Sequence, residues 1–120
     1  MSHTMNIQIE IHDRTALLTA CERLKLRTEE GTHWLCSTKE TGLAVFLPGW
    51  LYPVVVKEDG SITFDNFDGR WGSMEEMNKL RAFYGLEKAK IEAHLKGYLT
   101  YESINTQTRE LELRVRIGDG

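Results

Sequence analysis

The sequence has few cysteines and no long apolar stretch. These two shortages argue against a disulfide-rich protein and against a membrane-spanning one. Its two cysteines, Cys21 and Cys36, are too few for a disulfide framework, so both are expected to be reduced thiols. The apolar runs are far shorter than the roughly 20 residues that cross a bilayer. Residues 1–6 lack the basic stretch and apolar core of a secretory signal. We therefore expect a soluble, cytoplasmic protein that does not associate with membranes.

An excess of basic side chains is also missing. The chain has 15 lysines and arginines and 18 aspartates and glutamates, for a formal net charge of −3. Domains that bind phosphate backbones usually carry a basic excess, so this balance argues against a nucleic-acid partner. A hydrophobic fraction of 41% and a length of 120 residues suit an ordinary globular chain. The sequence therefore predicts a single domain over residues 1–120.

Periodicity predicts the elements of the first half. Apolar and polar residues alternate over Met5–Ile11, which indicates a half-buried strand. Asp13 can cap a helix over Arg14–Arg23, because its carboxylate accepts a free backbone N–H. Strands are expected at Lys25–Thr28 and His33–Cys36, joined by a turn at Gly31. The apolar run Leu43–Leu47 is typical of a buried strand, and Pro48-Gly49 ends it.

In the second half, the residues that mark turns and helix ends are clearer. Asp59-Gly60 between Tyr52–Lys57 and Ser61–Asp65 predicts a tight hairpin. Ser73 and Glu76 have the spacing of a capping box at the start of a long helix, and Gly97 suits its end. Alternation then predicts a hairpin of residues 98–104 and 111–117, with its apolar side chains buried under helices and with Arg114 and Arg116 exposed.

These elements predict an α+β fold. We expect an antiparallel or mixed sheet of six to eight strands with two helices on one face. The first strand, the first helix and the last helix–strand unit are compatible with a ferredoxin-like core.

The most distinctive segment of the sequence lies between the hairpin and the long helix. An arginine there can bind a carboxylate or phosphate and an indole can stack on a ring, whereas ordinary turn chemistry explains the same residue types. In the second interpretation the tryptophan packs under the long helix, and a nearby aspartate holds the arginine. Trp50 is either an exposed interface anchor or the closing residue of the core. The candidate contact residues are Asp65, Asn66, Asp68, Arg70, Trp71 and Trp50.

No catalytic or metal-binding constellation stands out. His33 and Cys36 are three residues apart on an expected strand, so they face opposite sides. Gly-x-Ser-x-Gly, Walker and paired-histidine motifs are missing. We therefore assign no catalytic residue, metal ligand or cofactor, and lean against an enzyme. A basic strip that stacks single-stranded nucleic acid remains an alternative, formed by Lys25, Arg27, Arg109, Arg114 and Arg116 with Tyr98 or Tyr101.

Several segments resemble one protein family. They are Tyr52–Val56, Asp65–Gly72, Glu87–Ala93 and Lys96–Tyr98, together with the opening residues 1–3. They are similar to the hypothetical chloroplast reading frame thirty-five family, also called domain of unknown function twelve fifty-seven. The resemblance implies a cytoplasmic or, in algal relatives, plastid-stromal protein. It also implies an accessory role in a complex, because some members are encoded near an AAA-type ATPase. It implies no catalytic residue.

The leading hypothesis is a non-enzymatic protein-interaction or adaptor module that forms a homo-oligomer or binds a protein partner. Two alternatives stay open at this point. One is a small-ligand binder or enzyme that uses the Asp65–Trp71 loop, and the other is a single-stranded nucleic-acid binding module.

Overall fold

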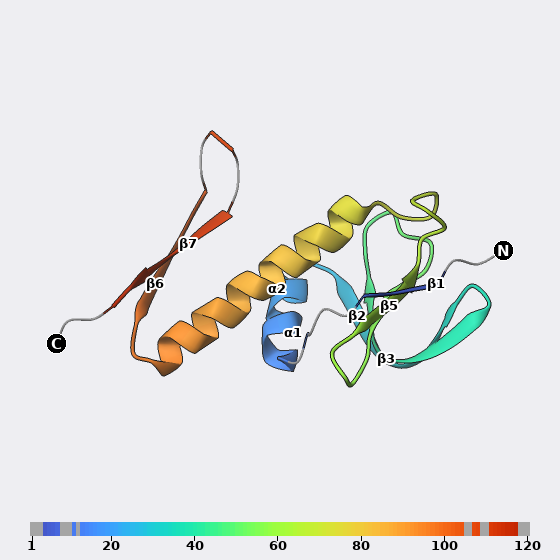
Figure 1. The fold of residues 1–120 in the computed structure, drawn as a ribbon, viewed down its shortest axis with the longest axis horizontal. Helices are drawn as coiled ribbons and strands as arrows, with labels where there is room; N and C mark the ends of the chain where they lie inside the picture. Colours follow the sequence, from blue (N-terminus) through green and yellow to red (C-terminus); the bar gives the residue numbers. More distant parts are fainter. Residues whose placement is uncertain (1–3, 8–10, 12, 105–106, 109–110, 118–120) are drawn as a thin grey trace.

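The computed structural model of the chain describes residues 4–7, 11, 13–104, 107–108 and 111–117. The body holds five strands and both helices, and Figure 1 shows the last hairpin set apart from it, starting near the far end of the long helix. The elements in chain order are β1 (Thr4–Ile7), α1 (Arg14–Arg23), β2 (Arg27–Leu35), β3 (Thr38–Phe46), β4 (Val54–Val56), β5 (Ile62–Asp65), α2 (Met74–Leu95), β6 (Leu99–Ile104) and β7 (Leu111–Arg116).

The main sheet has the strand order β1-β5-β4-β3-β2, and each neighbouring pair is antiparallel. The predicted α+β class with antiparallel strands is confirmed. The expected hairpin at Asp59-Gly60 joins β4 to β5, with the Lys57 N–H donating to the Ser61 carbonyl. Of the strand expected over Met5–Ile11, β1 covers the first residues, and residues 8–10 lie outside the described residues.

Both helices pack on one face of this sheet. Leu43 and Val45 of β3 and Val54 and Val56 of β4 point to the same face, as the register of the two strands requires. They form one buried cluster with residues of both helices and of β5: Ala16, Leu17, Ala20, Cys21, Ile62, Phe64, Met77, Leu80 and Tyr84. The expected burial of Leu43–Leu47 is confirmed except at the half-buried Phe46.

The β2–β3 hairpin differs from the prediction. Gly31 does not make a turn, because β2 continues through it and pairs Gly31 with Gly42 of β3. The turn instead lies at Cys36 and Ser37. A side chain at position 42 would bring its Cβ within 2.4 Å of the Val56 carbonyl oxygen. Gly42 is therefore needed for a close approach between strands, and only the folded sheet reveals that need.

The same hairpin also bends back on itself. Strand register places Phe46 opposite Arg27, yet the ring of His33 lies 6.4 Å from that of Phe46. The His33 Nε2 also lies 3.0 Å from the carbonyl oxygen of Glu29, four residues earlier, which an extended strand would carry out of reach. The far half of the hairpin is thus folded over the sheet face opposite to the helices, where Leu35 is buried.

Helix α2 begins and ends at the predicted residues. The Ser73 hydroxyl accepts the Glu75 N–H at 3.1 Å. At the other end the N–H groups of Gly97 and Tyr98 donate to the carbonyls of His94 and Ala93, and Gly97 has a φ of 79°. This pair of hydrogen bonds is the Schellman motif, which requires a residue in the left-handed conformation and therefore favours glycine. The 22 residues of α2 span about 33 Å, which carries its last turns beyond the sheet.

The terminal hairpin is a separate sheet. Strands β6 and β7 pair with each other in six positions and do not join the main sheet. A ferredoxin-like core is therefore not formed, since it needs the last strand inside the main sheet. The expected burial under helices was also wrong here: Leu113 is half-buried, while Val115 and Ile117 are exposed. Arg114 and Arg116 are exposed as predicted. Val115 lies opposite Thr100, which contacts His94 of α2, so this face of the hairpin is directed toward α2 but is covered only in part.

Candidate aromatic contact site

The loop between β5 and α2 is held by its own polar groups. The buried Asp65 carboxylate accepts the Phe67 N–H at 3.1 Å, which forms an Asx turn. The carbonyl of buried Asn66 accepts the N–H groups of Gly69 and Trp71, and its side-chain amide donates to the carbonyl of Gly72 at 3.2 Å. Asp65 and Asn66 therefore shape the loop and do not face solvent. Two of the candidate contact residues thus have a structural role.

The tip of this loop has an uncommon backbone. Phe67 and Asp68 have φ values of 47° and 54°, and Gly69 follows at 93°. Left-handed conformations cost a bulky non-glycine residue free energy, of order 1–3 kcal/mol where the strain is severe. The surrounding hydrogen bonds hold two such residues in succession. The resulting turn leaves Asp68 and Arg70 exposed and Phe67 half-buried.

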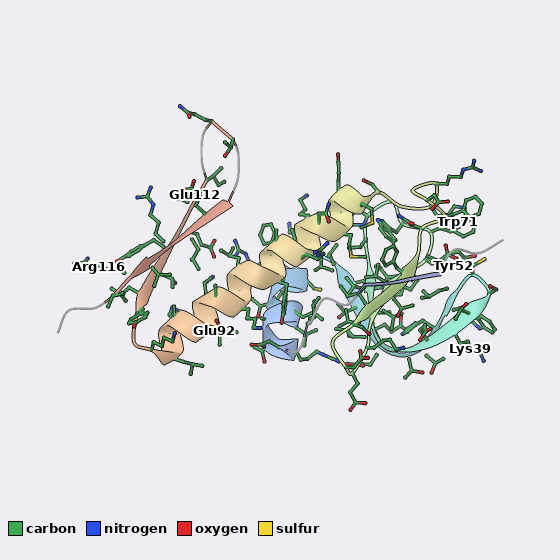
Figure 2. The ribbon with its side chains drawn as sticks, viewed as in Figure 1. Lys39, Tyr52, Trp71, Glu92, Glu112 and Arg116 are labelled. Carbon is green, nitrogen blue, oxygen red and sulfur yellow. The ribbon has the colours of Figure 1, made fainter. Side chains whose placement is uncertain are left out.

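An aromatic cluster of Tyr52, Phe67 and Trp71 covers this turn. The rings of Phe67 and Trp71 are stacked, with centroids 4.7 Å apart and planes at 22°. The ring of Tyr52 meets Trp71 edge-on at 5.6 Å, and Figure 2 shows these two side chains together at the end of the body far from β7. All three rings are half-buried. The cluster therefore presents a preformed aromatic surface.

Arg70 extends this surface with a positive charge. Its guanidinium carbon lies 5.2 Å from the centre of the Phe67 ring, a cation–π distance, and the residue is exposed. We expected Asp65 or Asp68 to hold Arg70 by an ion pair. Among the described residues no such pair is formed, because the Asp65 carboxylate is turned inward to the loop backbone.

Trp50, and not Trp71, packs at the start of α2. The Trp50 Nε1–H donates to the Ser73 carbonyl at 3.0 Å, and its ring meets Phe64 edge-on at 5.6 Å. A Cβ added at Gly72 would come within 2.3 Å of the Trp50 ring. The prediction that Trp71 fixes the helix to the sheet was therefore wrong. A residue 23 positions before the capping residue Ser73 has this role, and loop spacing alone carries no sign of it.

Tyr52 and Phe67 belong to the site, although sequence reasoning did not select them. Partial burial raises the pKa of the Tyr52 phenol above its ordinary value, with smaller contributions from the hydrogen-bonded Cys36 thiol and the Asp65 carboxylate. The Cys36 contact shows that the β2–β3 turn reaches this end of the body. One sequence signal existed: Phe67 is a large apolar residue amid turn-forming residues, where burial does not explain it.

The remaining reactive groups do not assemble into a site. In the part of the chain that the structure describes, no three His, Cys, Asp or Glu side chains gather as metal ligands. His33 contacts Phe46 and the Glu29 carbonyl, whereas Cys36 meets Tyr52. Burial raises the pKa of the Cys21 thiol to about 11, which keeps it protonated and unreactive at neutral pH.

The basic strip considered from the sequence is divided. Arg27 of β2 lies over the ring of Phe46 at 4.0 Å, within the main sheet. Arg114 and Arg116 belong to the separate hairpin, on the strand next to β6. Arg109 lies outside the described residues. The basic residues that the structure describes therefore do not form one continuous face.

A charged network joins the body to the terminal hairpin. Glu102 of β6 accepts hydrogen bonds from Arg23 of α1 at 2.9 Å and from Lys90 of α2 at 2.7 Å. The same two cations contact Glu87, which is buried on α2. These hydrogen bonds lower the pKa of Glu102 and raise the pKa values of Arg23 and Lys90. The network fixes where β6 lies against α2.

Comparison with protein-family models, with curated proteins and with solved structures finds no match to this chain. The family resemblance seen in the sequence stays a prediction. Within the described residues, neither helix combines the length and the apolar character that a membrane span requires.

Proposed function

We propose that this chain is a non-enzymatic protein-interaction module whose contact surface is the aromatic cluster with Arg70. The observation that supports it is the strained turn at Phe67 and Asp68, which holds stacked rings at the surface. Strain of this kind persists where a fold maintains a functional conformation. Tryptophan, tyrosine and arginine are also the residue types enriched at binding hot spots.

The chemistry of the surface favours a protein segment with an acidic and an apolar residue. Arg70 supplies an exposed guanidinium that binds a carboxylate, and Trp71 supplies an indole edge for an apolar side chain. A small-ligand site that uses this loop is less well supported, because the polar groups of Asp65 and Asn66 are engaged by the loop itself. The divided basic residues likewise weaken the nucleic-acid alternative.

Selection from a displayed peptide library tests this proposal without a known partner. Peptides selected on the parent protein should bind Trp71→Ala or Arg70→Ala at least about tenfold more weakly, since hot-spot truncations cost more than about 1–2 kcal/mol. Lys79→Ala is the matched control, because Lys79 is an exposed residue of α2 away from the loop. Circular dichroism should show that each variant stays folded. Peptides that bind all variants equally, or a failure to select any, would refute the proposal.

A further inference from the structure

The hairpin β6–β7 is incomplete as a folding unit. A lone two-stranded hairpin is marginally stable in water, and three or more strands are usually needed. Its side chains also expose large apolar surfaces, with Leu99 54%, Ile104 65% and Val115 47% accessible. The molecule is correspondingly extended, at 58 × 33 × 22 Å. The hairpin therefore has both backbone and apolar surface left to pair.

The two strands of the hairpin differ in their side-chain contacts with the body. Strand β6 lies beside α2, where Glu102 contacts Lys90 and the Thr100 hydroxyl lies 3.3 Å from His94 Nε2. Strand β7 pairs only with β6 among the described strands, so its outer edge has no strand partner among them. An open edge of this kind is a template for another strand.

The sequence of β7 is complementary to itself. In an antiparallel pair of two β7 strands centred on Leu113, Glu112 of each copy lies opposite Arg114 of the other copy. In the same register Leu111 lies opposite Val115, and Leu113 lies opposite its own counterpart. Within Leu111–Val115 every charged residue thus meets an opposite charge, and every apolar residue meets an apolar one. Such direct cross-strand pairs are the stabilising units of a sheet.

Neighbouring registers do not give this match of opposite charges and apolar pairs. A shift that centres the pair on Arg114 opposes two arginines, and one that centres it on Glu112 opposes two glutamates. Intermediate registers place apolar residues opposite charged ones and invert the two faces of one strand. Only the register centred on Leu113 combines opposite charges with matched faces within Leu111–Val115.

We propose that a second copy of this chain binds here, and that the two copies join along the outer edges of β7 in the register centred on Leu113. The two hairpins then form one continuous antiparallel sheet, β6-β7-β7-β6, about a twofold axis. Leu113 and Val115 of both copies then lie on the same face of this sheet.

Charge reversal tests the proposed register. Light scattering should give the parent protein a mass twice the 13.8 kDa of the chain. Glu112→Arg and Arg114→Glu each place like charges opposite one another twice, so each should weaken dimerisation at least about tenfold. An equimolar mixture of the two variants should dimerise again, because each glutamate then meets an arginine. Lys79→Glu, a charge reversal on α2, should leave the dimer unchanged.

Each outcome of this experiment decides the proposal. A parent protein that is monomeric at millimolar concentration refutes it. A dimer that persists in both single variants refutes it too, since that dimer uses another surface. Circular dichroism of the single variants separates lost pairing from lost folding. Recovery in the mixture cannot arise from a folding defect.

Cysteine cross-linking gives an independent reading of the register. In a Cys36→Ser background, Leu113→Cys places two thiols directly opposite each other, within the range of a disulfide. This variant should form a disulfide-linked dimer on mild oxidation. Val115→Cys is the matched control, because its thiol faces Leu111 of the other copy and should not link. Equal linking of both variants contradicts the register.

Discussion

The body of this protein and its terminal hairpin are built from similar strand patterns, yet they bury very different amounts of apolar surface. Val55 in β4 is fully buried, whereas Val115 in β7 is 47% accessible. Both valines lie in an antiparallel strand with paired neighbours. The difference lies in what covers the strand: β4 is central and packed, and β7 is an edge strand of a two-stranded sheet. The burial of a residue in a strand thus depends on which elements pack against that strand, and not on the strand itself.

Replacing one leucine of the body and one of the hairpin by alanine should show the largest difference in the free energy of unfolding. Leu80 of α2 is completely buried between the helices and the sheet, and Leu99 of β6 is mostly exposed. Leu80→Ala should lower the free energy of unfolding by about 2–5 kcal/mol. Leu99→Ala should change it by less than about 0.5 kcal/mol, as at an ordinary surface position. Urea denaturation of both variants measures this, and similar losses would mean that the hairpin is part of the body core.

The two tryptophans of the loop region should show the next largest contrast. Trp50→Ala removes a core contact, a hydrogen bond to Ser73 and the ring that packs on Gly72, and should cost about 3 kcal/mol. Trp71→Ala removes two surface ring contacts, each worth about 0.5–1.5 kcal/mol. Denaturant unfolding should therefore rank Trp50→Ala as the more damaging. The opposite order would restore the interpretation in which Trp71 fixes the helix.

The smallest expected effect on stability concerns the ion pairs of Glu102, which join the hairpin to the body. The lowered pKa of Glu102 means that its ion pairs stabilise the fold above its unfolded pKa, and that this contribution disappears as pH falls through the lower folded pKa. The raised pKa values of Arg23 and Lys90 give a contribution that is present at neutral pH and lost only at strongly alkaline pH. Because the groups are partly solvated, Glu102→Gln should cost about 1 kcal/mol at pH 7.

The measurement is thermal unfolding across acidic pH. The difference in stability between the parent protein and Glu102→Gln should be present at pH 7 and should shrink below pH 4. Glu92→Gln, on an exposed face of α2, is the matched control and should show little difference at either pH. A Glu102 effect that does not depend on pH would show that packing, and not charge, joins β6 to α2.

Local signals predicted the helices well, because their ends depend on neighbouring residues. Asp13, Ser73 and Gly97 act through bonds to groups within a few positions, and all three have the predicted roles. Gly31 was misjudged because its partner, Gly42, lies on another strand. The close approach at this pair is between Gly42 and the Val56 carbonyl of β4, and it arises only after the sheet has formed.

The candidate site was predicted as a region but not in its details. The loop from Asp65 to Trp71 does carry the most unusual backbone and ring contacts. The sequence could not show that Tyr52 joins it, or that Trp50 and not Trp71 packs on Gly72. Both facts depend on how the segment before β4 lies against the loop, through the bond from the Leu51 N–H to the Trp71 carbonyl. Alternation likewise predicted β7 but not the sheet to which it belongs.

Gly97 determines the direction in which β6 leaves the end of α2. Strand β6 starts two residues after it and extends about 20 Å from there. A rotation of about 10° at Gly97 would move the far end of β6 sideways by about 3.5 Å. The hydrogen bonds from Gly97 and Tyr98 to the carbonyls of His94 and Ala93 therefore set the direction in which β6 starts, and the bonds of Glu102 to Arg23 and Lys90 hold that direction further along the strand.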